Sequence, residues 1–332
     1  MKKWGHCATI EKNRTVIAYE EFKMNIITVT LNPAVDLHYS VDSLAPLGYN
    51  NARFIRRDSG GKGVNLSRAL LAGRVKSTCY IALGRLGADE FVAPLKEQGI
   101  APILTLVDGR ARENINLMQK DGETVIATVG PALGEAELSD MEEKLLPEIG
   151  TDTVIVLAGS IPAGTDKYAV LKRLMRFHSL GAKIAVDSKS FDLSDIIPLS
   201  PYLIKPNEHE AEMLTGIEVT GFESAIKAAA AIRDMGVESV LLSMGAAGAV
   251  LASPEGVYVA NAPRVSPKST VGAGDSTLAG FLAARSRGLS DSEALGSAIA
   301  FGTAACLEEG SLPPRDEVIK TLIPEINVTQ KM

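Results

Sequence analysis

The sequence predicts an α/β fold with a mostly parallel central sheet and helices on both faces. First, apolar runs of strand length alternate with longer stretches of helical periodicity, as in βαβ units. Second, 46% of the residues are hydrophobic but only 5% are aromatic, which favours small side chains packed between helices and a sheet. Third, 332 residues are enough for one large domain or two modest ones.

The predicted elements alternate along the chain from residue 26. Strands are expected at 26–31, 77–83, 154–158, 183–187, 202–205 and 239–243. Helices are expected at 63–72, 89–98, 168–180, 208–214, 224–234 and 278–285. Ligands of such sheets bind at the carboxyl ends of the strands, so polar residues that follow a strand are candidates for a site.

Two segments break the alternation and predict a second, small β-sheet. Residues 36–58 contain short alternating pieces, and residues 112–129 predict a hairpin around Asp121-Gly122, a dipeptide typical of tight turns. We expect these strands to lie over the main domain as a lid, as the surface of a homodimer, or as both. One domain over residues 24–325 would then carry the whole site.

The first 23 residues differ from the rest, since they mix charged residues with short apolar pieces and contain no signal-peptide core. We expect Met24 to be the natural start and residues 1–23 to be an extension, poorly ordered. Mass spectrometry of the protein from its source cells tests this, and an intact Met1 would refute it.

Composition excludes several classes of partner. The net charge is −6 without a long Lys/Arg stripe, which argues against nucleic acid, and no apolar run reaches membrane-spanning length. The three cysteines form neither a CxxC pair nor a zinc pattern, which is typical of a reducing, cytoplasmic environment. The four histidines show no spacing for a metal.

A glycine-rich turn before the last predicted helix is the most informative motif. Gly272, Ala273 and Gly274 let the backbone approach a ligand closely, and the N–H groups of the helix start suit a phosphate. Asp275 stands within this anion site, where a carboxylate could take a proton from a hydroxyl that attacks a phosphoryl group. The alternative is a plain turn with Asp275 as helix N-cap.

A second glycine-rich turn, Gly60-Gly61-Lys62-Gly63, also precedes a predicted helix. Lys62 offers a positive charge and Asn65 an amide for sugar hydroxyls or phosphate. The turn is not a Walker A loop because Gly63 follows the lysine, and neither turn completes GxGxxG. The alternative is a tight turn with an exposed lysine.

Other polar residues follow the predicted strands and add to the candidate site. Asp36 can accept hydrogen bonds from sugar hydroxyls, and Asn207 and Glu210 lie three apart at a helix start, where oxygen ligands can hold Mg²⁺. Further candidates at strand ends are Ser160, Asp187, Ser243, Gly245 and Gly248. Turn formation alone explains Asp36 and the 243–248 segment equally well.

Together these motifs resemble the PfkB-type sugar kinases of the ribokinase-like superfamily, from Met24 onward. Gly-Gly-Lys-Gly-x-Asn, Lys-Pro-Asn-x-x-Glu and Gly-Ala-Gly-Asp occur here in the family's order. The opening 30–36, Thr-Leu-Asn-Pro-Ala-Val-Asp, is most similar to the branch that contains 1-phosphofructokinase and tagatose-6-phosphate kinase. The resemblance implies a ribokinase-like fold with a β-sheet lid, and ATP and Mg²⁺ as cofactors.

The resemblance also implies a role for each candidate. Asp275 would be the catalytic base, with Gly272, Ala273 and Gly274 as its anion hole. ATP would lie at Lys205, Asn207, Ser243, Gly245, Gly248 and Gly274, and Mg²⁺ would be held through water by Asn207 and Glu210. Sugar hydroxyls would contact Asp36, Gly60, Gly61 and Asn65. The acceptor's phosphate would meet Lys62 and Arg112, near Ser160.

The implied reaction is ATP-dependent phosphorylation of a ketohexose monophosphate, with fructose 1-phosphate favoured over tagatose 6-phosphate and fructose 6-phosphate. A neutral sugar would leave Lys62 and Arg112 without an anion. A sensor without catalysis, built on the same fold, is the alternative of another class. The chain departs from many relatives in carrying Asn50 and Asn51 where they have Arg, with Arg53 slightly later, so the phosphate contacts of that strand stay open.

Overall fold

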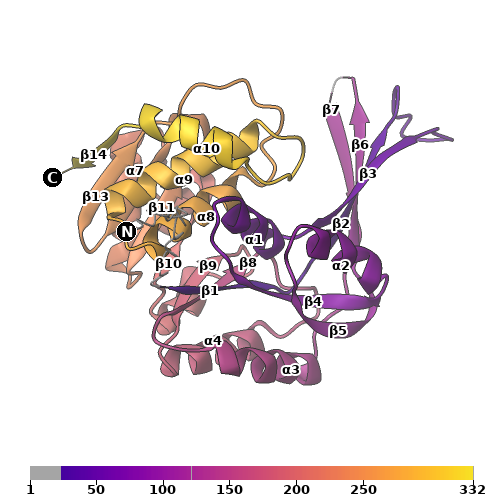
Figure 1. The fold of residues 1–332 in the computed structure, drawn as a ribbon, viewed down its shortest axis with the longest axis horizontal. Coiled ribbons are helices and arrows are strands. Elements are labelled where there is room, and N and C mark those ends of the chain that lie inside the picture. The colour runs from indigo at the N-terminus through magenta and orange to yellow at the C-terminus, as the bar shows by residue number, and fades with distance from the viewer. Residues whose placement is uncertain (1–23, 121, 332) are drawn as a thin grey trace, which may run out of the picture.

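The computed structural model describes residues 24–120 and 122–331, which contain a large sheet and a smaller one (Figure 1). The expected extension 1–23 and Asp121 of the predicted hairpin turn lie outside the described residues. The strand order of the large sheet is β14-β13-β12-β11-β10-β9-β8-β1-β4-β5. From β11 to β5 the neighbours are parallel, and β11 to β14 are antiparallel.

The parallel strands of the large sheet alternate with helices along the chain, as the sequence predicts. Its strands are β1 (Asn25–Thr30), β4 (Thr78–Leu86), β5 (Ile103–Arg110), β8 (Thr153–Ala158), β9 (Lys183–Asp187), β10 (Leu203–Ile204), β11 (Ser239–Ser243), β12 (Ala249–Ser253), β13 (Gly256–Ala260) and β14 (Val328–Lys331). The fold class is therefore confirmed, although β5 and the antiparallel edge β12–β14 were not predicted.

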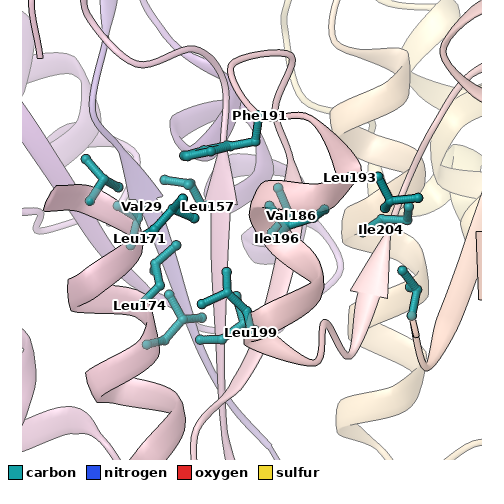
Figure 2. Close-up of a cluster of buried hydrophobic side chains, with 14 of the residues drawn as sticks. Val29, Leu157, Leu171, Leu174, Val186, Phe191, Leu193, Ile196, Leu199 and Ile204 are labelled. Atoms are coloured by element: carbon teal, nitrogen blue, oxygen red, sulfur yellow. The ribbon is translucent and has the colours of Figure 1, made fainter. Parts of the chain in front are cut away.

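Helices cover both faces of this sheet (Figure 1). They are α1 (Lys62–Ala72), α2 (Ala88–Glu97), α3 (Glu135–Leu145), α4 (Lys167–Ser179), α5 (Leu193–Ile196), α6 (Glu208–Thr215), α7 (Phe222–Asp234), α8 (Ala273–Ser286), α9 (Asp291–Cys306) and α10 (Asp316–Leu322). Buried side chains of α3, α4 and α7 form one core with the sheet, part of which Figure 2 shows, and α1, α8, α9 and α10 form a second. Within the described residues, no helix is both long and apolar enough to cross a bilayer.

Helices α1 and α8 pack closely enough to bring their N-terminal ends together at the sheet edge. A Cβ on Gly63 would lie 2.4 Å from Thr30 Oγ1, so α1 sits directly on β1. A Cβ on Gly280 would lie 2.8 Å from Phe301 Cγ, and one on Gly73 would lie 2.4 Å from Phe301 Cζ. Glycine is needed at these positions because the helices leave no space for a side chain.

The smaller sheet has the order β3-β2-β6-β7 and projects from the main domain on the α2 side (Figure 1). Its strands are β2 (Ala34–Ser40), β3 (Arg53–Gly60), β6 (Arg112–Gln119) and β7 (Gly122–Ala127). Strand β2 pairs antiparallel with β3 and parallel with β6. The two segments that interrupted the alternation thus form the small sheet that the sequence predicts.

Candidate active site

The starts of α1 and α8 bring together two residues that are 210 positions apart in sequence. Asn65 Nδ2 donates a hydrogen bond to Asp275 Oδ2 at 3.0 Å. The amide oxygen, Asn65 Oδ1, is buried and has no hydrogen-bond partner among the described residues. A buried acceptor without a partner is costly unless a ligand satisfies it, so Asn65 is poised to accept a hydrogen bond from a hydroxyl group.

Asp275 has the properties of a general base. Its side chain is buried, and burial raises its pKa from 3.8 to about 6, assisted by the negative charge of Asp187. The hydrogen bond from Asn65 and the charges of Lys62 and Lys205 oppose this rise in pKa. A carboxylate with a pKa near neutrality is ionised at pH 7 and still accepts a proton readily.

Asp187, the last residue of β9, lies between two lysines. Its Oδ1 accepts a 2.9 Å hydrogen bond from Lys62 Nζ, and its Oδ2 lies 3.7 Å from Lys205 Nζ, an ion-pair distance. Burial alone would raise the pKa of Asp187, but Lys205 and Lys62 hold it below its usual range. Asp187 was expected only as an acid at a strand end, because its partner Lys62 is 125 residues away in the chain.

The turn before α8 lies beside the Lys205 ammonium group. Gly272 is the N-cap with a φ of 77°, so Asp275 lies inside the first helical turn and the N-cap interpretation of Asp275 is wrong. A Cβ on Gly274 would lie 3.2 Å from Lys205 Nζ, which places the ammonium against the turn. Ala273 N–H bonds Thr270 O at 3.3 Å, whereas the next N–H groups of a helix start have no intrahelical acceptor.

The helix also begins five residues before the predicted range, at Ala273 instead of residue 278. Small and polar residues carry no apolar periodicity, so the prediction assigned this stretch to the loop. In the structure Asp275, Ser276 and Thr277 are nevertheless buried. The first turn of the helix was therefore missed, although it contains Asp275, which contacts Asn65.

Asp36 on β2 lies where the smaller sheet meets the main domain. Its Oδ1 accepts a 2.7 Å hydrogen bond from Asn114 Nδ2 of β6. A Cβ on Gly60 would lie 2.1 Å from Asp36 Oδ2, so Gly60 makes room for this carboxylate. Gly61 has a φ of 128°, a conformation that favours glycine, and turns the chain into α1. Burial raises the pKa of Asp36.

Arg112 at the start of β6 belongs to a separate polar group. Its Nε donates to Asn32 O at 3.3 Å, and Asn32 Nδ2 donates to Ser160 Oγ at 2.9 Å. These bonds connect the smaller sheet with the loops that follow β1 and β8. Asn32 was part of the motif that revealed the family but was not predicted as a site residue.

Asn207 and Glu210 bond each other's backbone in a capping box at the start of α6. Asn207 Oδ1 accepts from Glu210 N–H at 2.9 Å, and Glu210 Oε2 accepts from Asn207 N–H at 3.0 Å. Glu210 Oε1 remains and lies 3.4 Å from Lys189 Nζ. Within the described residues no group of three or more His, Cys, Asp or Glu side chains is placed to hold a metal ion.

The 243–248 segment follows β11 beside Asn207, with which Ser243 forms a parallel bridge. Gly245 has a φ of 52°, and a Cβ there would meet no atom within 4 Å. A Cβ on Gly248 would instead lie 1.9 Å from Ala260 O. Gly248 is therefore explained by packing against β13, whereas Gly245 borders open space.

The structure thus places Lys62, Asn65, Lys205 and Asp275 in one group, with Asp36 and Arg112 beside the smaller sheet. A buried base close to a helix start and two lysines suits transfer of a phosphoryl group to a hydroxyl, where charge neutralisation matters most. Fold and site together define a small-molecule kinase of the α/β class.

Comparison with known proteins specifies the class further. The profile of the pfkB family carbohydrate kinases matches residues 30–317, and the chain belongs to this family. It is 32% identical to 1-phosphofructokinase of Bacillus subtilis (strain 168), over 92% of this chain and 99% of that protein. It is also 32% identical to 1-phosphofructokinase of Escherichia coli (strain K12), over 77% of this chain and 83% of that one.

Solved structures agree with the family assignment. Phosphofructokinase-2 from Escherichia coli in complex with substrates and products has a TM-score of 0.85 at 25% identity, covering 91% of this chain and 99% of that chain. The tetrameric inhibited form of the same enzyme has a TM-score of 0.83 at 25% identity. The protein is thus a carbohydrate kinase, a phosphotransferase that uses ATP as cosubstrate.

Replacing Asp275 by an uncharged residue should stabilise the folded protein. The pKa of Asp275 rises from 3.8 to about 6 on folding, so ionisation above pH 6 costs about 3 kcal/mol, and the cost disappears near pH 4. We expect Asp275→Asn to raise Tm at pH 8 but not at pH 4, measured by thermal unfolding. The control Asp108→Asn alters a carboxylate that is 99% exposed and should change Tm at neither pH. An Asp275→Asn gain independent of pH would contradict the shifted pKa.

Proposed function

We propose that the protein transfers the γ-phosphoryl group of ATP to a ketohexose monophosphate, most favourably converting fructose 1-phosphate to fructose 1,6-bisphosphate. The observation that carries the proposal is the buried Asp275 carboxylate, bonded to Asn65 and placed beside Lys62 and Lys205. The relatives named 1-phosphofructokinase support the choice of fructose 1-phosphate. Tagatose 6-phosphate and fructose 6-phosphate are the alternatives within the same chemistry.

In this proposal Asp275 takes the proton of the acceptor's free primary hydroxyl, and the hydroxyl oxygen attacks the γ-phosphorus. The bond from that phosphorus to the bridging oxygen breaks, and ADP leaves with the electron pair. Asn65 holds the base through its amide N–H and accepts from a sugar hydroxyl through Oδ1. The N–H groups at the start of α8 and the Lys205 ammonium stabilise negative charge on the transferred group. General-base assistance of this kind is typically worth about 10²–10⁴-fold in rate.

The residues around Asn207 fit Mg²⁺ held through water. Both Asn207 Oδ1 and Glu210 Oε2 bond backbone N–H groups, which leaves Glu210 Oε1 and the second lone pairs for water molecules. Mg²⁺ commonly keeps several waters when it binds beside nucleotide phosphates. When bound it would neutralise phosphate charge, while Ser243 and Gly245 would border the nucleotide.

The acceptor's existing phosphate is assigned to Arg112, with Ser160 nearby. Arg112 is bonded only through Nε in the described structure, at 3.3 Å to Asn32 O, so its terminal nitrogens are available for an anion. Asp36, with Gly60 and Gly61 beside it, would hold sugar hydroxyls. Lys62 is paired with Asp187 and interacts electrostatically with Asp275, so we assign it to the transferred phosphoryl group as well as to acceptor binding.

We also propose that the smaller sheet is a lid on a single kinase domain over residues 24–325. Asp36 and Arg112 belong to this sheet, so an acceptor bound to them would lie beneath it and be shielded from water. ATP and sugar phosphates are intracellular metabolites, which places the reaction in the cytoplasm. Fractionation of the source cells would test that placement.

A coupled ADP-release assay with Mg-ATP tests the reaction directly. It compares kcat/KM for fructose 1-phosphate, tagatose 6-phosphate, fructose 6-phosphate and unphosphorylated fructose. We expect a clear preference for one phosphorylated ketose, with fructose 1-phosphate first. Activity on fructose alone would overturn the phosphate site, and ATP binding without turnover on any acceptor would favour a sensor.

Two variants distinguish the roles of Arg112 and Lys62 in the same assay. Arg112→Ala should raise KM for the phosphorylated acceptor about tenfold or more, since a charge-assisted hydrogen bond contributes about 1.5–3 kcal/mol. Lys62→Ala should mainly lower kcat, by about 10²-fold or more, because it acts on the transferred group. If Lys62 binds only the acceptor's phosphate, both variants would raise KM and leave kcat unchanged.

The smaller sheet is also proposed as a homodimer surface. Its strands expose large apolar side chains at Phe54, Ile55, Met118, Val125 and Ile126, and its outer strands β3 and β7 are free edges in the described chain. The tetrameric form of the Escherichia coli relative supports self-association.

Light scattering of the purified protein measures this association. We expect a dimer that Val125→Lys converts to monomer, because a charge at an apolar interface costs desolvation energy. Met213→Lys is the control, since Met213 is 74% exposed on α6, outside the smaller sheet. A monomeric wild type, or dissociation by Met213→Lys alone, would contradict the lid interface.

A further inference from the structure

Arg56, a residue outside the reaction site, connects the smaller sheet to the main domain. It lies on β3, where its Nε donates a 2.8 Å hydrogen bond to Asp58 Oδ2 of the same strand. Its Nη1 lies 3.5 Å from Glu309 Oε2, in the loop that follows α9. Asp58 Oδ2 also lies 3.3 Å from His38 Nε2 on β2, so the guanidinium is held in place from the sheet side.

The loop that receives Arg56 is shaped for this contact at Gly310. Gly310 has a φ of 59°, and a Cβ there would lie 2.0 Å from Arg56 Nη2. The Arg56 guanidinium therefore contacts the loop backbone at Gly310, where a side chain would displace it. The contact is thus more extensive than the ion pair with Glu309 alone.

The same loop touches the turn that begins α8. A Cβ on Gly272 would lie 3.6 Å from Ser311 Cα, and Ser311 is buried. Gly272 is the N-cap of α8, three residues before Asp275. The loop 307–311 therefore lies between Arg56 of the smaller sheet and the turn that carries the base.

We propose that Arg56 is a positioning residue that fastens the lid to the loop 307–311, and thereby holds the turn at Gly272 in place when the lid is closed. This role rests on the proposed kinase function. Asp58 orients the guanidinium from within the sheet, and Glu309 and Gly310 receive it on the main domain. Closure of the lid over the acceptor is thus linked to the geometry of the turn that carries Asp275.

The Arg56–Glu309 ion pair is weak enough to break and form again as the lid opens and closes. Glu309 is 71% exposed, and ion pairs of this kind contribute little and are screened by salt. Losing the pair should shift the lid equilibrium about two- to fivefold, a change that alters binding without unfolding the protein. A lid that must open at every turnover needs a weak fastening of this kind.

The kinetic test compares Arg56→Ala with Arg57→Ala. Arg57 is the neighbouring residue and pairs with Glu90 of α2, so its loss removes the same charge from the same strand without touching the loop. We expect Arg56→Ala to raise KM for the acceptor about two- to fivefold at low salt and to lower kcat by a similar factor, because the turn that carries Asp275 is held less firmly. Both effects should be smaller at high salt. Glu309→Gln should give a similar change, and the double variant should be less than additive. Equal KM values for Arg56→Ala and Arg57→Ala would overturn the proposal.

A second measurement needs no substrate, so it separates this proposal from the kinase assignment. Amide hydrogen exchange of the free protein should become faster in the loop 307–311 of Arg56→Ala but not of Arg57→Ala, whereas β3 loses an ion pair to the main domain in both variants. That result would support the contact between Arg56 and the loop 307–311 even if none of the four sugars were phosphorylated. Unchanged exchange in that loop would refute it whatever the substrate.

Discussion

The site depends on the burial of Asp187 between Lys62 and Lys205. Two buried carboxylates, Asp187 and Asp275, interact unfavourably, and removing each from water costs several kcal/mol. The lysines keep Asp187 ionised while Asp275 retains a pKa near neutrality. Each member comes from a different element: α1, the end of β9, the residue after β10, and α8. These charge interactions therefore connect the two glycine-rich turns to the sheet and hold the Asp275 carboxylate near Lys62 and Lys205.

The parallel sheet makes this arrangement possible because its strands end at one edge, where α1 and α8 also begin. Close packing at Gly63 sets α1 against β1, and Phe301 of α9 packs against both Gly73 at the end of α1 and Gly280 of α8. Four polar groups lie between the smaller sheet and the main domain or at its strand ends: Arg112 with Ser160, Asp36, Asn65 with Asp275, and Lys205 with the turn at Gly274. The proposed acceptor, with a phosphate at one end and its reacting hydroxyl at the other, would contact the first three.

Local motifs could be predicted from sequence, but contacts between distant segments could not. The turns around Gly61 and Gly272 carry their signal within a few residues, so Asp275 and Asn65 were identified and the structure joins them. The Lys62–Asp187 bond links residues 125 apart and leaves no local pattern. The pattern Asn-x-x-Glu before a helix is typical of a capping box, but Asn207 and Glu210 were interpreted as ligands of Mg²⁺. Strands β12–β14 were missed because short antiparallel edge strands resemble loops. The contact of Arg56 with the loop 307–311 was missed because Glu309 is more than 250 residues away in sequence.

The pH dependence of kcat/KM for the acceptor, in the wild type and in Asp187→Asn, measures how far the charge of Asp187 sets the pKa of Asp275. We expect an acidic limb at a pKa of about 6 in the wild type, because in the proposed reaction turnover requires ionised Asp275. In Asp187→Asn the limb should move to lower pH, since the repelling charge is gone and both lysines can stabilise Asp275. A substrate phosphate also titrates near pH 6, at about its second pKa, but that limb would not move between the two proteins. If no acidic limb moved to lower pH in Asp187→Asn, the charge of Asp187 would not set the pKa of Asp275.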